Sequence, residues 1–253
     1  EIRLSLVGSE MCIRDSPNTT ASMTRKIGEA AKAVASPSTE VTAVNPAHGP
    51  VSIEGFYDEA FCVPGLLEEV RKGVDEGYDG FLVACFGDPG LDACREISTA
   101  PVIGICEAAM HVASLVAHRF TVVTTNHRSV PRIGELAHRY GVERRCHLQA
   151  AGVTVLSLEE PGSEAQMKVE AMARRAVQEE GAEAVLLGCA GMADLSARLS
   201  ERLGVPCIDG VAAGTKLLEA LVGLGVKTSK ALAWSPPFAK PYAGMFAPYA
   251  PKG

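Results

Sequence analysis

The sequence predicts an α/β protein of two similar lobes, each built on a parallel sheet and related to the other by a pseudo-twofold axis. The chain has 253 residues, which is enough for two such lobes. Short apolar strands alternate with helix-length segments, as in parallel sheets that helices cover on both faces. Residues 76–87 are also matched by residues 180–191, and both segments combine a helix end, a strand, a cysteine and a glycine. We therefore expect the active site in the cleft between two repeated units.

The expected elements follow one another from Thr20. Apolar residues at helical spacing predict a helix that begins after Thr20 and continues to Val34. A loop over residues 45–50 separates the first predicted strand from a helix over residues 57–76. The predicted strands cover residues 40–44, 81–84, 102–105, 120–124, 153–156, 185–187 and 205–208. The segment after Trp234 is rich in proline and is expected to be extended on the surface.

The domain boundaries follow from this order. We expect a first lobe over residues 17–110, completed by residues 211–253, and a second lobe over residues 111–210. Residues 1–16 do not begin with methionine, show no clean period and meet the following segment abruptly. They are therefore expected to be foreign sequence, and no strand is predicted there. A genomic or transcript read across codon 16 would test this.

Charge and hydropathy exclude two kinds of partner. The chain has 24 basic and 30 acidic residues, a formal charge of -6, and no run of lysines or arginines. No phosphate-binding surface is expected, and nucleic acid is excluded as a partner. The apolar stretches around residues 108–117 and 217–226 are too short or too interrupted by charge to cross a bilayer.

The eight cysteines indicate free thiols. They form no CxxC pair and do not combine with the six histidines at zinc-like spacings, so no metal is expected. Free thiols without a disulfide framework are typical of a reducing cytosol, and we expect a cytoplasmic protein. Buried packing is the expected role of five of them: Cys62, Cys94, Cys106, Cys146 and Cys207.

Cys85 and Cys189 occupy equivalent places in the repeat, each just past the carboxyl end of a buried strand. Parallel sheets bind ligands at that edge, and the start of a following helix would lower the thiol pKa toward neutrality. Across a cleft, one thiolate could remove a proton from an acidic carbon while the other thiol delivers one to the opposite face. This is the geometry of a two-base proton exchanger that needs no cofactor. Core packing is the alternative for both, but the glycines at 87 and 191 leave space for a ligand.

Five segments resemble the hydantoin and allantoin racemases of the aspartate/glutamate racemase superfamily. They cover residues 17–24, 49–55, 84–91, 187–192 and 228–230. The resemblance implies a two-lobed fold, cofactor independence, and Cys85 and Cys189 as the acid/base pair. It also implies that the first loop and the residues beside both cysteines line the substrate site. With Thr124 at the end of the central strand, the predicted substrate residues are Asn18, Thr19, Phe86, Gly87, Thr124, Gly188, Ala190 and Gly191.

The residues after the second cysteine favour a neutral substrate. Amino-acid racemases of the superfamily typically carry a threonine followed by histidine or an acid there, whereas this chain has Ala190 and Gly191. A hydantoin ring, whose C5 proton is acidified by its neighbours, fits better than a zwitterion, and backbone N–H groups could hold its enolate oxygen. Asp88 is expected to cap a helix that starts at Pro89.

We therefore expect a racemase that inverts C5 of 5-substituted hydantoins or allantoin. A decarboxylase or cis-trans isomerase of the same superfamily is the alternative among enzymes, and a non-catalytic small-molecule binding protein is the alternative of another class. The expected partner is the small-molecule substrate, and a homo-oligomer is left open.

Overall fold

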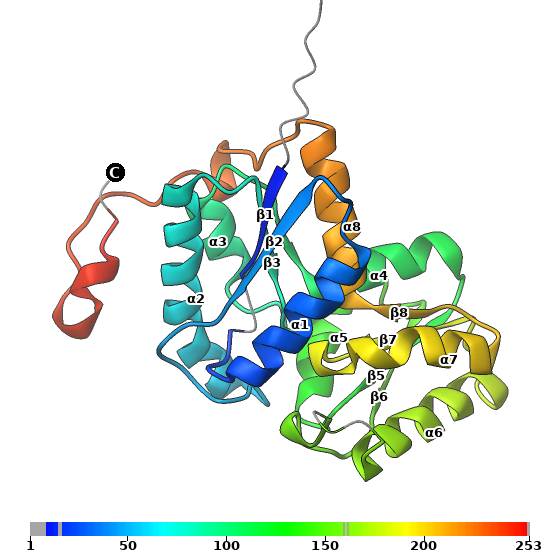
Figure 1. Ribbon diagram of the computed structural model, residues 1–253. Helices are drawn as coiled ribbons and strands as arrows, with labels where there is room; N and C mark the ends of the chain where they lie inside the picture. The colour runs from blue at the N-terminus through cyan, green and yellow to red at the C-terminus, as the bar shows by residue number, and fades with distance from the viewer. Residues whose placement is uncertain (1–8, 15–16, 159, 161, 252–253) are drawn as a thin grey trace, which may run out of the picture.

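The computed structural model describes residues 9–14, 17–158, 160 and 162–251. They form two lobes, each around a four-stranded parallel sheet (Figure 1). The first sheet has the order β2-β1-β3-β4, with β1 Ser9–Arg14, β2 Thr39–Val44, β3 Gly80–Val83 and β4 Val102–Gly104. The second has the order β6-β5-β7-β8, with β5 Phe120–Thr124, β6 Cys146–Ala150, β7 Ala184–Gly188 and β8 Cys207–Asp209. The identical strand order in both sheets confirms the predicted pair of similar α/β lobes.

Helices cover both faces of each sheet. Their bounds are α1 Ala21–Val34, α2 Phe56–Glu76, α3 Leu91–Ile97, α4 Ile105–Val116, α5 Ser129–Arg139, α6 Glu164–Gln178, α7 Ser196–Leu203 and α8 Gly210–Gly223. Short 3-10 helices lie in the connections and in the C-terminal segment, at Leu156–Leu158, Ala190–Leu195, Leu232–Trp234 and Gly244–Tyr249. Helices α2 and α3 pack on the outer face of the first sheet, and α6 and α7 on the outer face of the second. Helices α1, α4, α5 and α8 pack on the inner faces, between the two sheets (Figure 1).

The two lobes share one interior. In β3, Phe81 and Val83 face the outer layer, whereas Leu82 faces the central core between the sheets. In β7, Val185 faces the outer layer and Leu186 the same central core. Because both faces are covered, every position of these strands is apolar or glycine, which explains why they were predictable as continuous apolar runs. The common core holds the two sheets in a fixed relation across the cleft.

Helix α8 returns from the second sheet to the first lobe. It follows β8 but packs against α1, α4 and β3. A Cβ at Gly210 would lie 2.6 Å from the carbonyl oxygen of Ile105, so the starts of α8 and α4 approach as closely as backbones can. This arrangement supports the proposal that residues 211–253 complete the first lobe.

A strand lies before Pro17, where none was predicted. Strand β1 occupies the middle of the first sheet, with Ser9 to Arg14 in register with Thr39 to Val44 of β2 and Met11 opposite Gly80 of β3. Backbone hydrogen bonds to β2 on one side and β3 on the other define this strand, and such bonds require no side-chain periodicity. The foreign origin of residues 1–16 stays a prediction, and residues 1–8, 15 and 16 lie outside the described residues.

The strand predicted at residues 153–156 is wrong. The fourth strand of the second sheet is β6, at the edge, and residues 156–158 form a 3-10 helix. His147, Leu148 and Gln149 of β6 are partly or fully exposed, so this edge strand lacks the apolar run that marks the buried ones. Val155 is buried, but its N–H donates to the Glu54 carboxylate and not to a strand.

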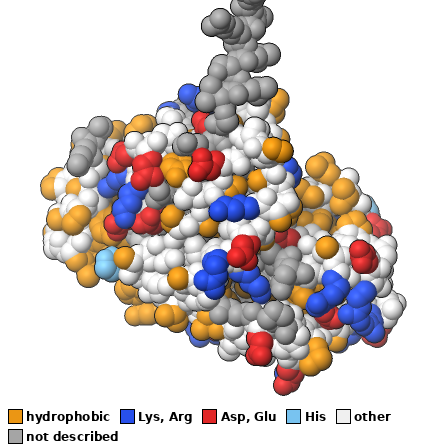
Figure 2. All heavy atoms as spheres, in the orientation of Figure 1, with side chains coloured by type: hydrophobic (Ala, Val, Ile, Leu, Met, Phe, Trp, Pro, Cys, Tyr) orange, Lys and Arg blue, Asp and Glu red, His pale blue; other side chains and the backbone are white. Residues whose placement is uncertain are grey.

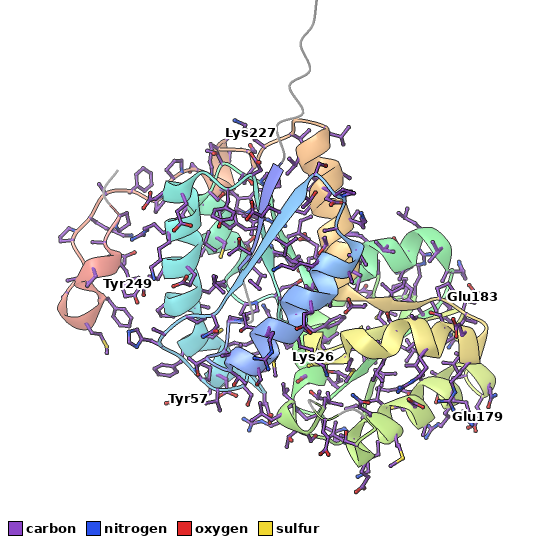
Figure 3. All side chains as sticks on the ribbon, in the orientation of Figure 1. Lys26, Tyr57, Glu179, Glu183, Lys227 and Tyr249 are labelled. Carbon is purple, nitrogen blue, oxygen red and sulfur yellow. The ribbon has the colours of Figure 1, made fainter. Side chains whose placement is uncertain are left out.

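The surface agrees with the predictions from composition. Acidic and basic side chains are interspersed over the face shown in Figure 2. Within the described residues, no helix is long and apolar enough to span a membrane. The segment after Trp234 is mostly exposed, as predicted, and lies beyond α2, with Tyr249 in its last helical turn (Figure 3).

Candidate functional site

Cys85 and Cys189 lie at the starts of two equivalent turns. Cys85 follows the end of β3, and the N–H of Asp88 donates to its carbonyl oxygen at 2.9 Å. Cys189 follows β7, and the N–H of Met192 donates to its carbonyl oxygen at 3.1 Å. The repeat seen in the sequence therefore produces the same local geometry twice.

The electrostatics of the two thiols are also alike. Burial raises the pKa of Cys85 well above its ordinary value, and a hydrogen bond from the Gly87 N–H opposes this shift. Burial raises the pKa of Cys189 to about 11, again opposed by a hydrogen bond from the Gly191 N–H. A thiolate at Cys189 would further raise the pKa of Cys85, so the two sulfurs lie close enough to interact.

The expectation that helix starts lower these pKa values toward neutrality is wrong. After Cys85 the next α-helix begins only at Leu91, and after Cys189 a 3-10 helix precedes α7. No α-helix dipole begins directly at either sulfur, and desolvation of the thiolate therefore dominates. Both groups are therefore weaker acids than a free cysteine thiol.

Both thiols line one cavity between the lobes, with about 610 Å³ of space not filled by atoms, including the mouth that is open to solvent. Six of the eight predicted substrate residues line it as well: Asn18, Phe86, Gly87, Thr124, Gly188 and Ala190. Thr19 does not line it, because its N–H and hydroxyl are directed to the carbonyl oxygen of Pro50. Gly191 does not line it either and instead lies beneath the Cys189 sulfur, to which it donates its N–H.

Three charged residues at the cavity were missed by the sequence analysis. Glu59 comes from α2, and Arg128 and Arg132 come from the start of α5. Arg132 and Glu59 form an ion pair at 3.2 Å across the lobes, and Arg132 Nε also donates to the Gly87 carbonyl oxygen at 3.1 Å. Burial raises the pKa of Glu59, and the Arg132 guanidinium opposes this. The spacing of Arg128 and Arg132 places them on one face of a helix, but only the packing of α5 shows which face meets the cavity.

Asp88 acts differently from the prediction. Helix α3 begins at Leu91, and Asp88 does not cap it; its carboxylate accepts the N–H groups of Cys106 and Glu107 at the start of α4, at 3.1 and 2.9 Å. It also accepts the hydroxyl of Tyr140 from the second lobe, at 2.7 Å. Asp88 has a φ of 43°, which is unusual for a residue with a side chain. Burial raises its pKa to about 7 in spite of these bonds.

The two strongest charges that act on Cys189 come from the first lobe. After burial and the Gly191 N–H, the largest influences on its pKa are Glu54, which raises it, and Lys26, which lowers it. Figure 3 shows Lys26 on α1, where this helix faces the second lobe. The Glu54 carboxylate accepts the N–H of Val155 at 3.1 Å. The loop before α2 is thus bonded to the second lobe at the cavity.

No metal site accompanies the thiols in the part of the chain that the structure describes, because no three His, Cys, Asp or Glu side chains gather there.

The model of the family described as Asp/Glu/Hydantoin racemase matches residues 16–218. The chain belongs to this family. The predicted family and enzyme class are therefore confirmed.

Individual members of the racemase family are similar over most of their length. The hydantoin racemase of Rhizobium meliloti is 48% identical over 90% of this chain and 95% of its own length. The hydantoin racemase of Pseudomonas sp. (strain NS671) is 45% identical over 90% of this chain and 92% of its own length. The solved structure of the allantoin racemase from Klebsiella pneumoniae is 46% identical, with a TM-score of 0.93 over 96% of this chain and 99% of that one.

Proposed function

We propose that this protein racemises the C5 stereocentre of 5-substituted hydantoins or allantoin, with Cys85 and Cys189 as the proton-exchanging pair and no cofactor. The observation that carries the proposal is the pair of equivalent thiols that line one cavity, each on a turn that aims a backbone N–H at its sulfur. The names of the similar proteins, hydantoin racemase and allantoin racemase, support the substrate class.

In the proposed reaction, C5 of the ring lies between the two sulfurs. One thiolate takes the C5 proton, and the electron pair of that C–H bond moves into the ring as an enolate. The opposite thiol then protonates the other face of C5, so the two cysteines exchange their protonation states. The N–H groups of Gly87 and Gly191 bond to the sulfurs, and those of Asp88 and Met192 close the turns.

The remaining N–H groups of the two turns belong to Phe86 and Ala190. We propose that they donate to the enolate oxygen, an interaction that often contributes about 3 kcal/mol.

The mutual influence of the two thiols on their pKa values suits this mechanism. Proton exchange needs one thiolate and one thiol at the same time. Because a thiolate at Cys189 raises the pKa of Cys85, ionisation of both is disfavoured, and the second group stays protonated as the acid. The acid role is thereby protected, because only one of the two sulfurs carries a charge at a time.

The two thiols also separate this proposal from two of its alternatives. A decarboxylase needs only one proton donor, and a binding protein needs no reactive group. Two equivalent thiols at one cavity favour inversion over either. Both must stay reduced, and the seven cysteines whose side chains are described are all free. We therefore propose a reducing compartment.

The test follows single enantiomers of allantoin and of 5-benzylhydantoin by optical rotation in deuterated buffer, against an enzyme-free blank. The wild-type protein should bring the rotation to zero with deuterium at C5. Cys85→Ser and Cys189→Ser should each abolish inversion, whereas Cys94→Ala, which removes a buried thiol outside the cavity, should retain it. Racemisation that survives in Cys85→Ser would refute the two-thiol scheme.

A further inference from the structure

The cavity has a buried inner end and an exposed outer end. We call the part of the lining formed by nearly fully buried residues the inner end; it includes Asn18, Met23 and Thr124, with exposed fractions of 4%, 3% and 1%. The outer end is lined by partly exposed residues of the loop before α2 and by Arg128, which is exposed. A ligand in the cavity therefore meets two different environments.

Arg128 crosses from the second lobe to the first at the outer end. A Cβ at Gly55 would lie 3.3 Å from Nη2, 3.4 Å from Nε and 3.5 Å from Cζ of Arg128. The guanidinium thus lies against the Gly55 backbone, where any larger residue would crowd it. This contact places a planar cation on the cavity wall.

Arg128 differs from the other charged residues of the cavity. Arg132 and Glu59 neutralise each other through their ion pair. Among the carboxylates that the structure describes, none forms an ion pair with Arg128. The backbone donors beside it are occupied, since the N–H groups of Arg128 and Ser129 both donate to Asn126 Oδ1, at 2.9 and 3.2 Å. The guanidinium is therefore the principal donor that this wall offers to a ligand.

The placement of the substrate decides what this donor meets. When C5 becomes planar between the two sulfurs, the ring and the C5 substituent extend from it in opposite directions. The ring has two carbonyl and two N–H groups, which need partners when buried. The Thr124 hydroxyl donates to the Gly188 carbonyl oxygen at 3.2 Å and can still accept a hydrogen bond, which makes the inner end suitable for the N–H groups of the ring. The C5 substituent then points to the outer end, toward Arg128.

We infer that Arg128 is a specificity-determining residue that donates hydrogen bonds to a carbonyl oxygen in the C5 substituent, so that the site prefers the ureido group of allantoin to an alkyl group. The inference rests on the proposed function for the position of C5. A charge-assisted hydrogen bond of this kind changes affinity by about tenfold or more. An alkyl substituent gains nothing from the guanidinium and must displace water from it.

Binding tests the inference without turnover. Calorimetry would compare the Kd of allantoin with that of 5-butylhydantoin in a Cys85→Ser/Cys189→Ser background, alone and with Arg128→Met. Allantoin should bind more tightly, and Arg128→Met should weaken allantoin about tenfold or more while 5-butylhydantoin changes less than about threefold. Arg128→Lys should recover part of the preference, because it keeps the charge but loses the planar donors.

Arg144→Met is the matched control, since it removes the same charge from an exposed residue outside the cavity. It should leave both Kd values unchanged. Tighter binding of 5-butylhydantoin, or an equal effect of Arg128→Met on both ligands, would overturn the inference. The same ratio should appear in kcat/KM of the intact enzyme. Selective binding without racemisation in the intact enzyme would refute the proposed function and leave this inference standing.

Discussion

Removal of the Tyr140 hydroxyl is expected to weaken the junction between the lobes in a pH-dependent way. Tyr140 follows α5 in the second lobe and donates to the buried Asp88 carboxylate of the first lobe at 2.7 Å. Tyr140→Phe deletes this bond without changing the shape of the ring. The two N–H groups at the start of α4 remain as donors to Asp88. The substitution therefore isolates one interaction between the lobes.

The size of the effect follows from the charge of the acceptor. A hydrogen bond to a charged group contributes about 1.5–3 kcal/mol, and one between neutral groups about 0.5–1.5 kcal/mol. Burial raises the pKa of Asp88 to about 7, and the Tyr140 bond opposes this, so the pKa rises further in Tyr140→Phe. Because the folded pKa lies above the unfolded value, the stability that protonated Asp88 contributes is present at low pH and is lost as pH rises through about 7.

This loss is greater in the variant. The difference in the free energy of unfolding between wild type and Tyr140→Phe should thus grow from about 1 kcal/mol at pH 5.5 to about 2 kcal/mol at pH 8.5.

Urea unfolding at pH 5.5, 7 and 8.5 measures this difference. Tyr78→Phe is the control, because the Tyr78 hydroxyl donates to a neutral partner, Thr42 Oγ1, at 3.2 Å. Its loss of stability should be the same at all three pH values. An effect of Tyr140→Phe that is constant with pH, or larger at pH 5.5, would refute the reasoning about the charged acceptor.

Three further predictions concern the turns and the helix junction. Gly87→Ala should displace the flexible Glu59 carboxylate, whose Oε1 would lie 2.4 Å from the added Cβ, and should cost about 1 kcal/mol of unfolding free energy by weakening the ion pair with Arg132. The equivalent Gly191→Ala, with 3.7 Å from its Cβ to the nearest neighbour, should cost less, and equal costs would contradict this. The rate at which iodoacetamide labels Cys189 should rise about tenfold per pH unit toward its pKa of about 11, and a plateau near pH 8 would show that the thiolate is more stable than burial allows. Gly210→Ala should lower Tm, because its Cβ would lie 2.6 Å from the backbone oxygen of Ile105. Gly223→Ala has no neighbour within 4 Å of its Cβ and should raise the unfolding free energy by about 0.4–1 kcal/mol. The reverse order of stability would refute the close approach of α4 and α8.

The sequence by itself determined the α/β class, the two lobes and the pair of cysteines at equivalent strand ends. These follow from local patterns: buried parallel strands are apolar on both faces, and a repeat preserves its spacing. Strand β6 was not predicted because an edge strand can be polar. Strand β1 was not predicted because backbone pairing with its neighbours defines it. Six of the eight predicted substrate residues line the cavity, because they follow or end the strands whose carboxyl ends form it.

Only the tertiary structure decided which charges surround the thiols. Glu59 and Arg132 belong to helices of different lobes, and no spacing in the chain relates them. Asp88 looked like a cap for the helix that follows it, but the start of α4 and Tyr140 supply its donors. The direction of the thiol pKa shifts also depended on the fold, because burial outweighs local hydrogen bonds once both lobes exclude water from the sulfurs. Desolvation and pairing between distant groups are properties of the packed chain, and the order of the residues alone does not contain them.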